Sequence, residues 1–173
     1  MRKGFTLIEL LVVISIIGLL AAAGLATFSS AQKRARDARR ISDIKAIETA
    51  LAQYYTENNM YPSSGGAVSP NSGWDNSNDS SWNDLATDLA PYLESMPIDP
   101  INTSSGWANS TNTYVYNFYS RGYGCNRQWY MLVYQLESSG TVTSPGAVSC
   151  NSTNFNYSGD PDTVTTGACS GCQ

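Results

Sequence analysis

The sequence predicts an α+β protein, in which a long N-terminal helix packs on a small antiparallel β-sheet head. No proline or glycine interrupts residues 26–59. Within that stretch Ile44, Ile47 and Leu51 recur three or four residues apart, the spacing of an amphipathic helix. Further along, residues 113–119 and 128–137 alternate in the manner of β-strands, with a hairpin connection between them.

The N-terminal part of the predicted helix is apolar enough to enter a membrane. Residues 5–28 form a run of 24 residues that carries a single charge, Glu9. As a helix this run would be roughly 36 Å long, which is enough to cross a bilayer core. A secretory signal peptide or a simple anchor fits less well, because an acid inside a spanning helix is costly unless it is paired. We expect residues 29–57 to continue the same helix with one apolar face.

The charges are unevenly distributed along the chain. Residues 33–40 carry five bases, whereas residues 58–173 carry nine acids and two bases, a net charge of −7. We expect the basic cluster to contact lipid head groups or the acidic surface of neighbouring heads. The acidic head disfavours nucleic acid as a specific ligand. The chain contains no histidine, which removes the commonest general base and most zinc sites, so we expect no enzyme.

The head, residues 58–173, contains further predicted elements. Asn58 and Asn59 are suited to a left-handed helix cap, and Pro62 blocks continuation of the helix. Residues 63–81 are rich in Ser, Gly and Asn and should form an exposed loop. Ser81 and Asp84 form a near capping box, which opens a short helix with three leucines turned inward: Leu85, Leu89 and Leu93. A third strand is expected near residues 140–149, and no element is predicted for the tail.

The four cysteines lie in the C-terminal third of the chain and indicate two disulfides. Three connectivities are possible. We favour Cys125–Cys150 with Cys169–Cys172, because the first bond would tie the hairpin to the following strand; pairing of the tail with the sheet is the main alternative. A zinc site would need all four cysteines to converge, and a redox pair would be expected to open a helix after a strand.

Two sequence elements resemble a known family. Residues 3–11, KGFTLIELL, resemble the class III signal of bacterial type IV pilins and type II secretion pseudopilins. Residues 96–100, MPIDP, resemble the Leu-Pro-x-Asp-Pro element of major pseudopilins, although Met replaces Leu and no Trp-Gly follows. The resemblance implies a pilin-like fold in which residues 1–4 are a leader. A prepilin peptidase would cut between Gly4 and Phe5, and the new N-terminus would be methylated.

The same resemblance gives Glu9 a role in assembly. It implies that the Glu9 carboxylate pairs with the amine of Phe5 on an adjacent subunit, because two charges that are each costly alone become tolerable together. The Thr6 hydroxyl could join this network. In some relatives calcium binds after the strands, which makes Asp160 and Asp162 weak metal candidates; no other cofactor is expected. The Asp75–Asp79 stretch is predicted to be a polar turn, because it lacks the glycine and the bidentate acid of a calcium loop.

The resemblance also implies a function. The chain would be a structural subunit of a type IV pilus-like filament, with identical subunits, the prepilin peptidase and an inner-membrane assembly platform as partners. The precursor would cross the cytoplasmic membrane once with its head outside, and the assembled filament would be extracellular. The loop of residues 63–81 and the cysteine-bearing tail favour a surface pilus. Residues 96–100 favour the alternative, a major pseudopilin of a type II secretion system; a minor pilin or adhesin is the third possibility.

Overall fold

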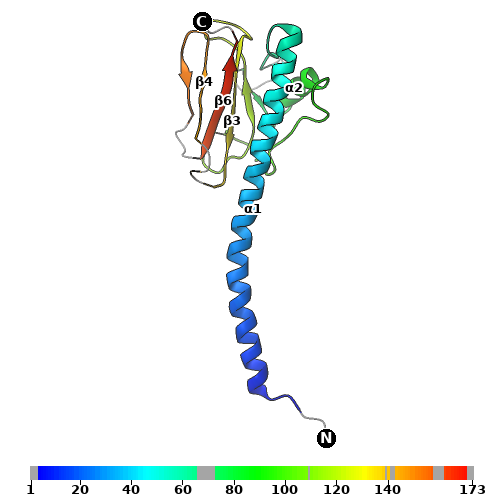
Figure 1. The fold of residues 1–173 in the computed structure, drawn as a ribbon, viewed down its shortest axis with the longest axis vertical. Coiled ribbons are helices and arrows are strands. Elements are labelled where there is room, and N and C mark those ends of the chain that lie inside the picture. Colours follow the sequence, from blue (N-terminus) through cyan, green and yellow to red (C-terminus); the bar gives the residue numbers. More distant parts are fainter. Residues whose placement is uncertain are drawn as a thin grey trace. The chain divides into compact units, whose positions relative to one another are not determined.

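The computed structural model of the chain describes residues 4–65, 73–108, 110–138, 140, 143–157 and 162–170. It confirms the predicted α+β class, with one long helix and antiparallel strands (Figure 1). The chain divides into two compact units, Met1–Ala35 and Arg36–Gln173. In chain order the elements are α1 (Leu7–Asn58), β1 (Asp75–Asn76), α2 (Trp82–Leu89), β2 (Asn117–Tyr119), β3 (Trp129–Gln135), β4 (Ala147–Val148), β5 (Asn154–Phe155) and β6 (Thr163–Cys169).

Helix α1 is continuous, as the absence of proline and glycine in its second half predicts. It ends where the sequence indicates. Asn59 adopts a φ of 55°, and its backbone N–H donates to the carbonyl of Tyr55 at 2.8 Å. This is the left-handed asparagine that satisfies one of the last helical carbonyls. The predicted apolar stripe of the second half is buried, with Ile44, Ile47 and Leu51 each at most 3% exposed.

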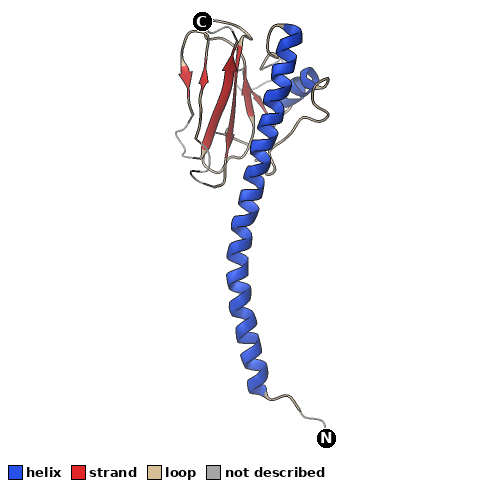
Figure 2. Cartoon of the chain, viewed as in Figure 1, coloured by secondary structure: helices blue, strands red, loops and turns tan. Residues whose placement is uncertain are grey.

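The main sheet has four antiparallel strands in the order β1-β2-β3-β6 (Figure 2). Strand β3 is one of its two inner strands and is buried along its whole length. Alternate residues of a strand point to opposite faces of the sheet. On β3, Tyr130, Leu132 and Tyr134 share one core with the buried residues of α1. Trp129 and Met131 join a second cluster, with Ala147 of β4 and Phe155 of β5.

The tail contains a strand that the sequence analysis missed. Strand β6 pairs with β3 over all seven residues, from Trp129 opposite Cys169 to Gln135 opposite Thr163. The expected strand over residues 140–149 is reduced to β4, which pairs with β5 in a separate two-stranded sheet. Of the first predicted strand, residues 113–119, only the last three form a strand, β2. The second predicted strand, residues 128–137, is confirmed as β3.

The expectation of an exposed loop over residues 63–81 is wrong in its second half; residues 66–72 lie outside the described part of the chain. Asp75 and Asn76 are buried and pair with β2. The predicted capping box at Ser81 is also absent. The Ser81 hydroxyl instead donates to Asp79 and accepts from the backbone N–H of Asn76. Helix α2 follows as predicted, with Leu85 and Leu89 buried, but it ends before Leu93, which is partly buried.

Candidate functional site

The predicted processing point lies in exposed, non-helical chain. Gly4, Phe5 and Thr6 precede α1 and are exposed, Phe5 by 83%. A Cβ placed on Gly4 would meet nothing within 4 Å. A protease needs an extended, accessible backbone around the bond that it cuts. The Gly4–Phe5 peptide bond therefore lies where such an enzyme can approach it.

Thr6 and Glu9 cap the start of the helix. The Glu9 carboxylate accepts hydrogen bonds from the Thr6 backbone N–H at 2.9 Å and from the Thr6 hydroxyl at 2.7 Å. In return, the Glu9 backbone N–H donates to Thr6 Oγ1 at 3.3 Å. This reciprocal pattern is a capping box. The sequence analysis placed both residues in one network but overlooked the Thr-x-x-Glu signature that indicates the cap.

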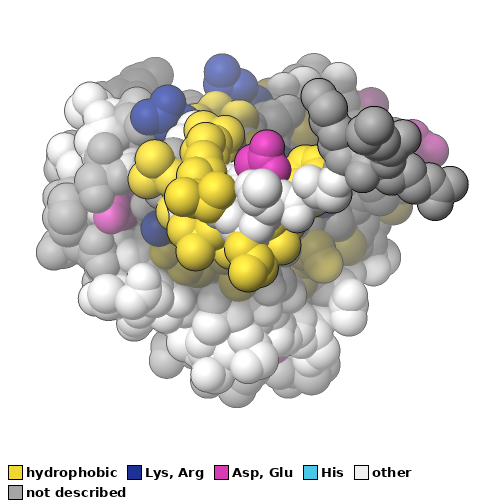
Figure 3. Space-filling view, turned by 90° about the horizontal axis from the view of Figure 1, so that it is seen from below, with side chains coloured by type: hydrophobic (Ala, Val, Ile, Leu, Met, Phe, Trp, Pro, Cys, Tyr) yellow, Lys and Arg dark blue, Asp and Glu magenta, His cyan; other side chains and the backbone are white. Residues whose placement is uncertain are grey.

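The first half of α1 presents an uncovered apolar surface. Its large side chains are half to almost fully exposed, for example Leu7 by 87%, Leu19 by 74% and Phe28 by 63%. In the view of Figure 3, hydrophobic side chains gather beside an acidic group. Among the described residues α1 alone is long and apolar enough to cross a membrane, with a mean hydropathy of 2.5 in its most apolar window. Such a surface requires cover from lipid or from other helices.

In the second unit, a network of charged groups fastens α1 to the head. The Arg40 guanidinium is fully buried and contacts three carboxylates. It donates to Asp99 at 2.6 and 3.1 Å, to Asp37 at 2.8 Å and to Glu137 at 2.8 Å. Arg36 adds a two-pronged pair with Glu137, at 2.7 and 2.5 Å. Asp99 belongs to the MPIDP element, so this motif holds the helix.

This network corrects the expectation for the basic cluster. Lys33 and Arg34 are exposed as predicted, but Arg36 and Arg40 bind acids of their own head. Burial lowers the pKa of Arg40, but the hydrogen bonds to Asp99, Glu137 and Asp37 outweigh it and leave the pKa raised. Burial likewise raises the pKa of Glu137, and its two arginine partners bring the pKa below the ordinary value. Arg40 and Glu137 are therefore both charged at neutral pH.

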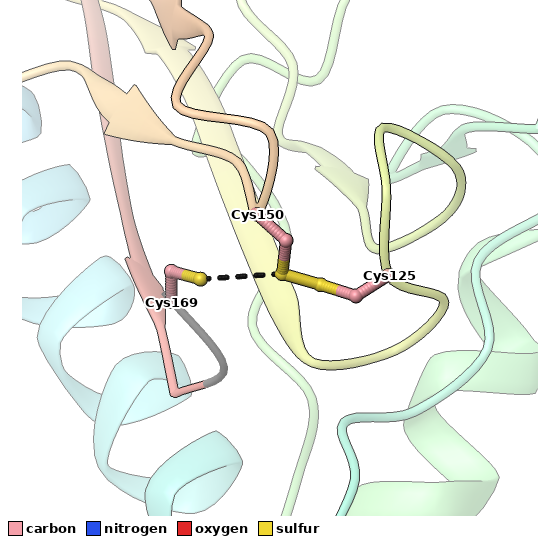
Figure 4. A group of neighbouring side chains, drawn as sticks. All are labelled: Cys125, Cys150 and Cys169. Atoms are coloured by element: carbon pink, nitrogen blue, oxygen red, sulfur yellow. Dashed lines mark hydrogen bonds between the residues drawn. A yellow bond between two sulfur atoms is a disulfide. The ribbon is translucent and has the colours of Figure 1, made fainter. Parts of the chain in front are cut away.

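Three of the four cysteines, Cys125, Cys150 and Cys169, meet at one end of the sheet (Figure 4). The favoured Cys125–Cys150 disulfide is present, with a Cα–Cα distance of 5.7 Å. Cys169 also takes part in a disulfide, and its Sγ lies 3.4 Å from that of Cys150. Cys172, its predicted partner, lies outside the described residues. A zinc ligand must be a thiolate, and these three sulfurs are disulfide sulfurs.

The acidic residues considered as calcium ligands are Asp79, Asp160 and Asp162. Asp79 is engaged within its own turn, because its carboxylate accepts from Ser81 N–H at 2.8 Å and from Asn76 Nδ2 at 2.9 Å. The polar turn expected over Asp75–Asp79 is thus present only from residue 77 onward, because Asp75 and Asn76 form the buried strand β1. Asp160 lies outside the described residues, whereas the carbonyl of Asp162 accepts from Leu136 N–H at 2.8 Å. Calcium at Asp160 and Asp162 stays a prediction.

The tryptophans and tyrosines pack mainly against one another. Trp74 lies 4.8 Å from Trp107 and 4.9 Å from Tyr119, measured between ring centroids, and Trp107 lies 4.9 Å from Tyr157. These four side chains are half-buried. The Trp74–Trp107 and Trp107–Tyr157 pairs meet edge to face, a geometry that stabilises packed aromatic clusters. The arrangement supports a core role over the ligand surface that an adhesin would need.

Two family models match the chain. Residues 1–25 match the prokaryotic N-terminal methylation motif, and residues 27–127 match type II secretion system protein G. The chain is also similar to the type II secretion system core protein G of Pseudomonas aeruginosa, with 36% identity over 101 residues, which cover 57% of this chain and 68% of that protein.

Other curated relatives match over shorter stretches. The type II secretion system core protein G of Pectobacterium carotovorum is 40% identical over 62 residues, 36% of this chain and 40% of that protein. The type IV major pilin protein PilA of Myxococcus xanthus is 39% identical over 60 residues, 35% of this chain and 27% of that protein. The chain thus spans less than half the length of these two relatives. No solved structure matches.

Proposed function

Since the chain belongs to the type II secretion system protein G family, we propose that it is the structural subunit of a type IV pilus-like filament, assembled through its N-terminal helix. The observation that carries the proposal is the uncovered apolar half of α1. A side-by-side bundle of identical helices would bury this surface, and the acidic heads would remain in water. The proposal assigns the chain a structural role and no catalytic one.

Processing would precede assembly. A prepilin peptidase would remove residues 1–4 and methylate the amine of Phe5. The Glu9 carboxylate, which Thr6 holds at the start of the helix, is then four residues from that new positive charge. Pairing with the amine of a neighbouring subunit would cancel both charges inside the apolar bundle and fix the axial register. Without the pair, each charge would be costly among apolar helices.

The proposed organisation follows from this route. Residues 5–28 would be the membrane span of the precursor and later the filament core. Residues 29–57 would carry the head, residues 58–173, outside the cytoplasmic membrane, where its disulfide is stable. An inner-membrane assembly platform would extract the subunit from the membrane. The final location would be an extracellular pilus.

A second candidate is a pseudopilin of a type II secretion system. The family match over residues 27–127 favours it, as does the MPIDP element whose Asp99 binds Arg40. The type IV pilus is favoured by residues 128–173, which extend beyond that match. These residues form strands β3 to β6 and include Cys150 and Cys169, two of the three cysteines whose sulfurs lie close together.

Fractionation of cells that produce the wild type, Glu9→Gln or Glu94→Gln tests the proposal. Glu94 is an exposed acid of the head and serves as the matched control. Immunoblots should show processed wild type and Glu94→Gln in sheared surface fibres. Glu9→Gln should be processed but reduced in that fraction at least about tenfold, because one charge of each pair is lost.

Three other results of this fractionation would change the conclusion. Processed protein confined to the cell envelope, with no sheared fibres, would favour the pseudopilin. Wild-type fibre levels with Glu9→Gln would contradict the pairing role of Glu9. A chain that keeps its leader would contradict filament assembly of either kind.

A further inference from the structure

Three cysteines from separate segments bring their sulfurs together at one end of the sheet. Cys125 lies in the connection from β2 to β3, Cys150 follows β4, and Cys169 ends β6. All three Sγ atoms lie within 4.8 Å of one another, and the Cys150–Cys169 pair is the 3.4 Å contact described above. In Figure 4 the Cys150 sulfur lies between the other two, so Cys169 faces the Cys125–Cys150 bond from the side of Cys150.

This is the arrangement that thiol–disulfide exchange requires. A thiolate attacks one sulfur of a disulfide, and the other sulfur leaves. We propose that Cys125, Cys150 and Cys169 form a thiol–disulfide exchange site, which uses a dithiol reductant as its substrate. The exchange would move the covalent link from Cys125–Cys150 to Cys150–Cys169.

The exchange takes two steps. A dithiol reduces the disulfide that contains Cys169 and is itself oxidised to its cyclic disulfide. The Cys169 thiolate attacks Cys150 Sγ, so that the Cys150–Cys169 bond forms and the Cys125–Cys150 bond breaks. The bonding electron pair leaves on Cys125 Sγ, which takes a proton from water. The second step needs no further oxidant or reductant.

The surrounding backbone holds the three sulfurs in reach of one another. Asn151 N–H donates to the Tyr123 carbonyl at 3.2 Å, which links the segment of Cys150 to that of Cys125. Ser170 N–H donates to the Gln128 carbonyl at 2.9 Å, which fixes the end of β6 beside the start of β3. All three cysteines are half-buried, so a small dithiol can reach them while the segments stay in place.

The exchange changes which parts of the head are linked. In the present pairing, Cys125 ties the connection between β2 and β3 to the segment after β4. In the alternative pairing, that segment is tied to β6. The connection keeps only its non-covalent contacts, such as those of the Tyr123 ring with Phe155 and Trp129. Cys125 becomes a half-buried thiol whose thiolate can attack an external disulfide, with the other sulfur of that disulfide leaving as a thiolate.

A three-cysteine variant tests the exchange without an added reductant. Cys172→Ser leaves only Cys125, Cys150 and Cys169. The full chain would be purified in detergent at pH 5, shifted to pH 8, alkylated with iodoacetamide over time and digested with trypsin. No Lys or Arg follows Arg127, so Cys125 falls in peptide 122–127 and the other two cysteines fall in peptide 128–173.

The expected result is release of peptide 122–127 with its cysteine alkylated. Release should accelerate about tenfold per pH unit below pH 8, because the thiolate is the attacking species. The matched control, Cys169→Ser/Cys172→Ser, lacks the attacking thiol and should keep the two peptides linked throughout. Equal behaviour of the two variants, with or without release, would overturn the proposal.

A second measurement uses the wild-type chain and does not depend on the variant. After treatment with one equivalent of dithiothreitol and alkylation, cleavage before Asp160 and Asp162 separates Cys150 from Cys169. The proposal expects a Cys150–Cys169 cross-linked peptide together with alkylated Cys125. Alkylation confined to the residues after Asp162, with Cys125–Cys150 intact, would overturn it.

Discussion

Replacing Arg40 with Met should destabilise the head by about 3–5 kcal/mol, the cost of leaving a buried charge without its partner. Methionine retains an unbranched apolar stem, so the substitution removes the guanidinium with little loss of packing volume. The guanidinium is fully buried and contacts three carboxylates. Its removal changes the five-residue network, which holds two bases and three acids, from a net charge of −1 to −2.

The remaining contacts indicate where the cost falls. Asp37 would keep the backbone N–H groups of Glu137 at 2.9 Å and Ser138 at 3.0 Å. Glu137 would keep its two-pronged pair with Arg36. Asp99 would lose both guanidinium contacts and keep the backbone N–H groups of Ile101 and Asn102. Two buried carboxylates, Asp37 and Asp99, are thus left without a cation, and this loss is the source of the expected destabilisation.

Urea unfolding of the full chain in detergent micelles measures this cost, with tryptophan fluorescence as the signal, because Trp82 and Trp129 are buried in the head. Arg39→Met is the matched control. Its side chain is 63% exposed and lies 3.7 Å from Asp43, so the loss should stay below about 1 kcal/mol. A loss with Arg40→Met no larger than that of Arg39→Met would refute the reasoning.

Two further substitutions test the packing and the ionisation of the head. Burial and the nearby Asp84, Asp79 and Asp88 raise the pKa of Asp75 to about 7, so the folded state holds a proton that the unfolded chain releases near pH 4. The free energy of unfolding should therefore fall as pH rises from 5 to 8. Asp75→Asn should remove about 2–3 kcal/mol of that fall, measured by urea titration at each pH. The same dependence on pH in wild type and Asp75→Asn would contradict the raised pKa of Asp75. A Cβ on Gly167 would collide with the Tyr130 carbonyl and approach Ala147 Cβ at 2.8 Å, so Gly167→Ala should lower the free energy of unfolding by about 1–3 kcal/mol. Gly18→Ala is the control, because a Cβ on Gly18 would meet nothing within 4 Å. Equal effects of the two substitutions on the free energy of unfolding would contradict the predicted collision at Gly167.

The long helix and the hairpin core could be predicted from the sequence because their signals are local. The spacing of Ile44, Ile47 and Leu51 and the alternation along β3 depend only on neighbouring residues. Strand β6 gives a weaker signal. Its sequence TVTTGAC is rich in threonine and contains Gly167, so its place beside β3 is decided by tertiary pairing.

The charged network around Arg40 and strand β1 could not be predicted from local sequence patterns, because their partners are distant in sequence. Arg40 meets Asp99 and Glu137, which are 59 and 97 residues away. Asp75 and Asn76 belong to a polar stretch that is typical of exposed loops. Asn76 can enter the core because its side-chain oxygen accepts from Asn117 and its backbone N–H donates to Ser81. Asp75 is buried beside it, and one of its carboxylate oxygens accepts from the Gly65 N–H.

The proposed function requires that the chain enters a filament through a processed N-terminal helix. The most direct test is intact-mass analysis of surface fibres sheared from the source cells, combined with N-terminal sequencing. The expected result is a dominant species that begins at N-methylated Phe5. Its mass should be lower than that of the fully reduced chain by the four hydrogens lost in two disulfides. A chain in the fibres that begins at Met1, or fibres that lack this protein, would contradict filament assembly through a processed helix.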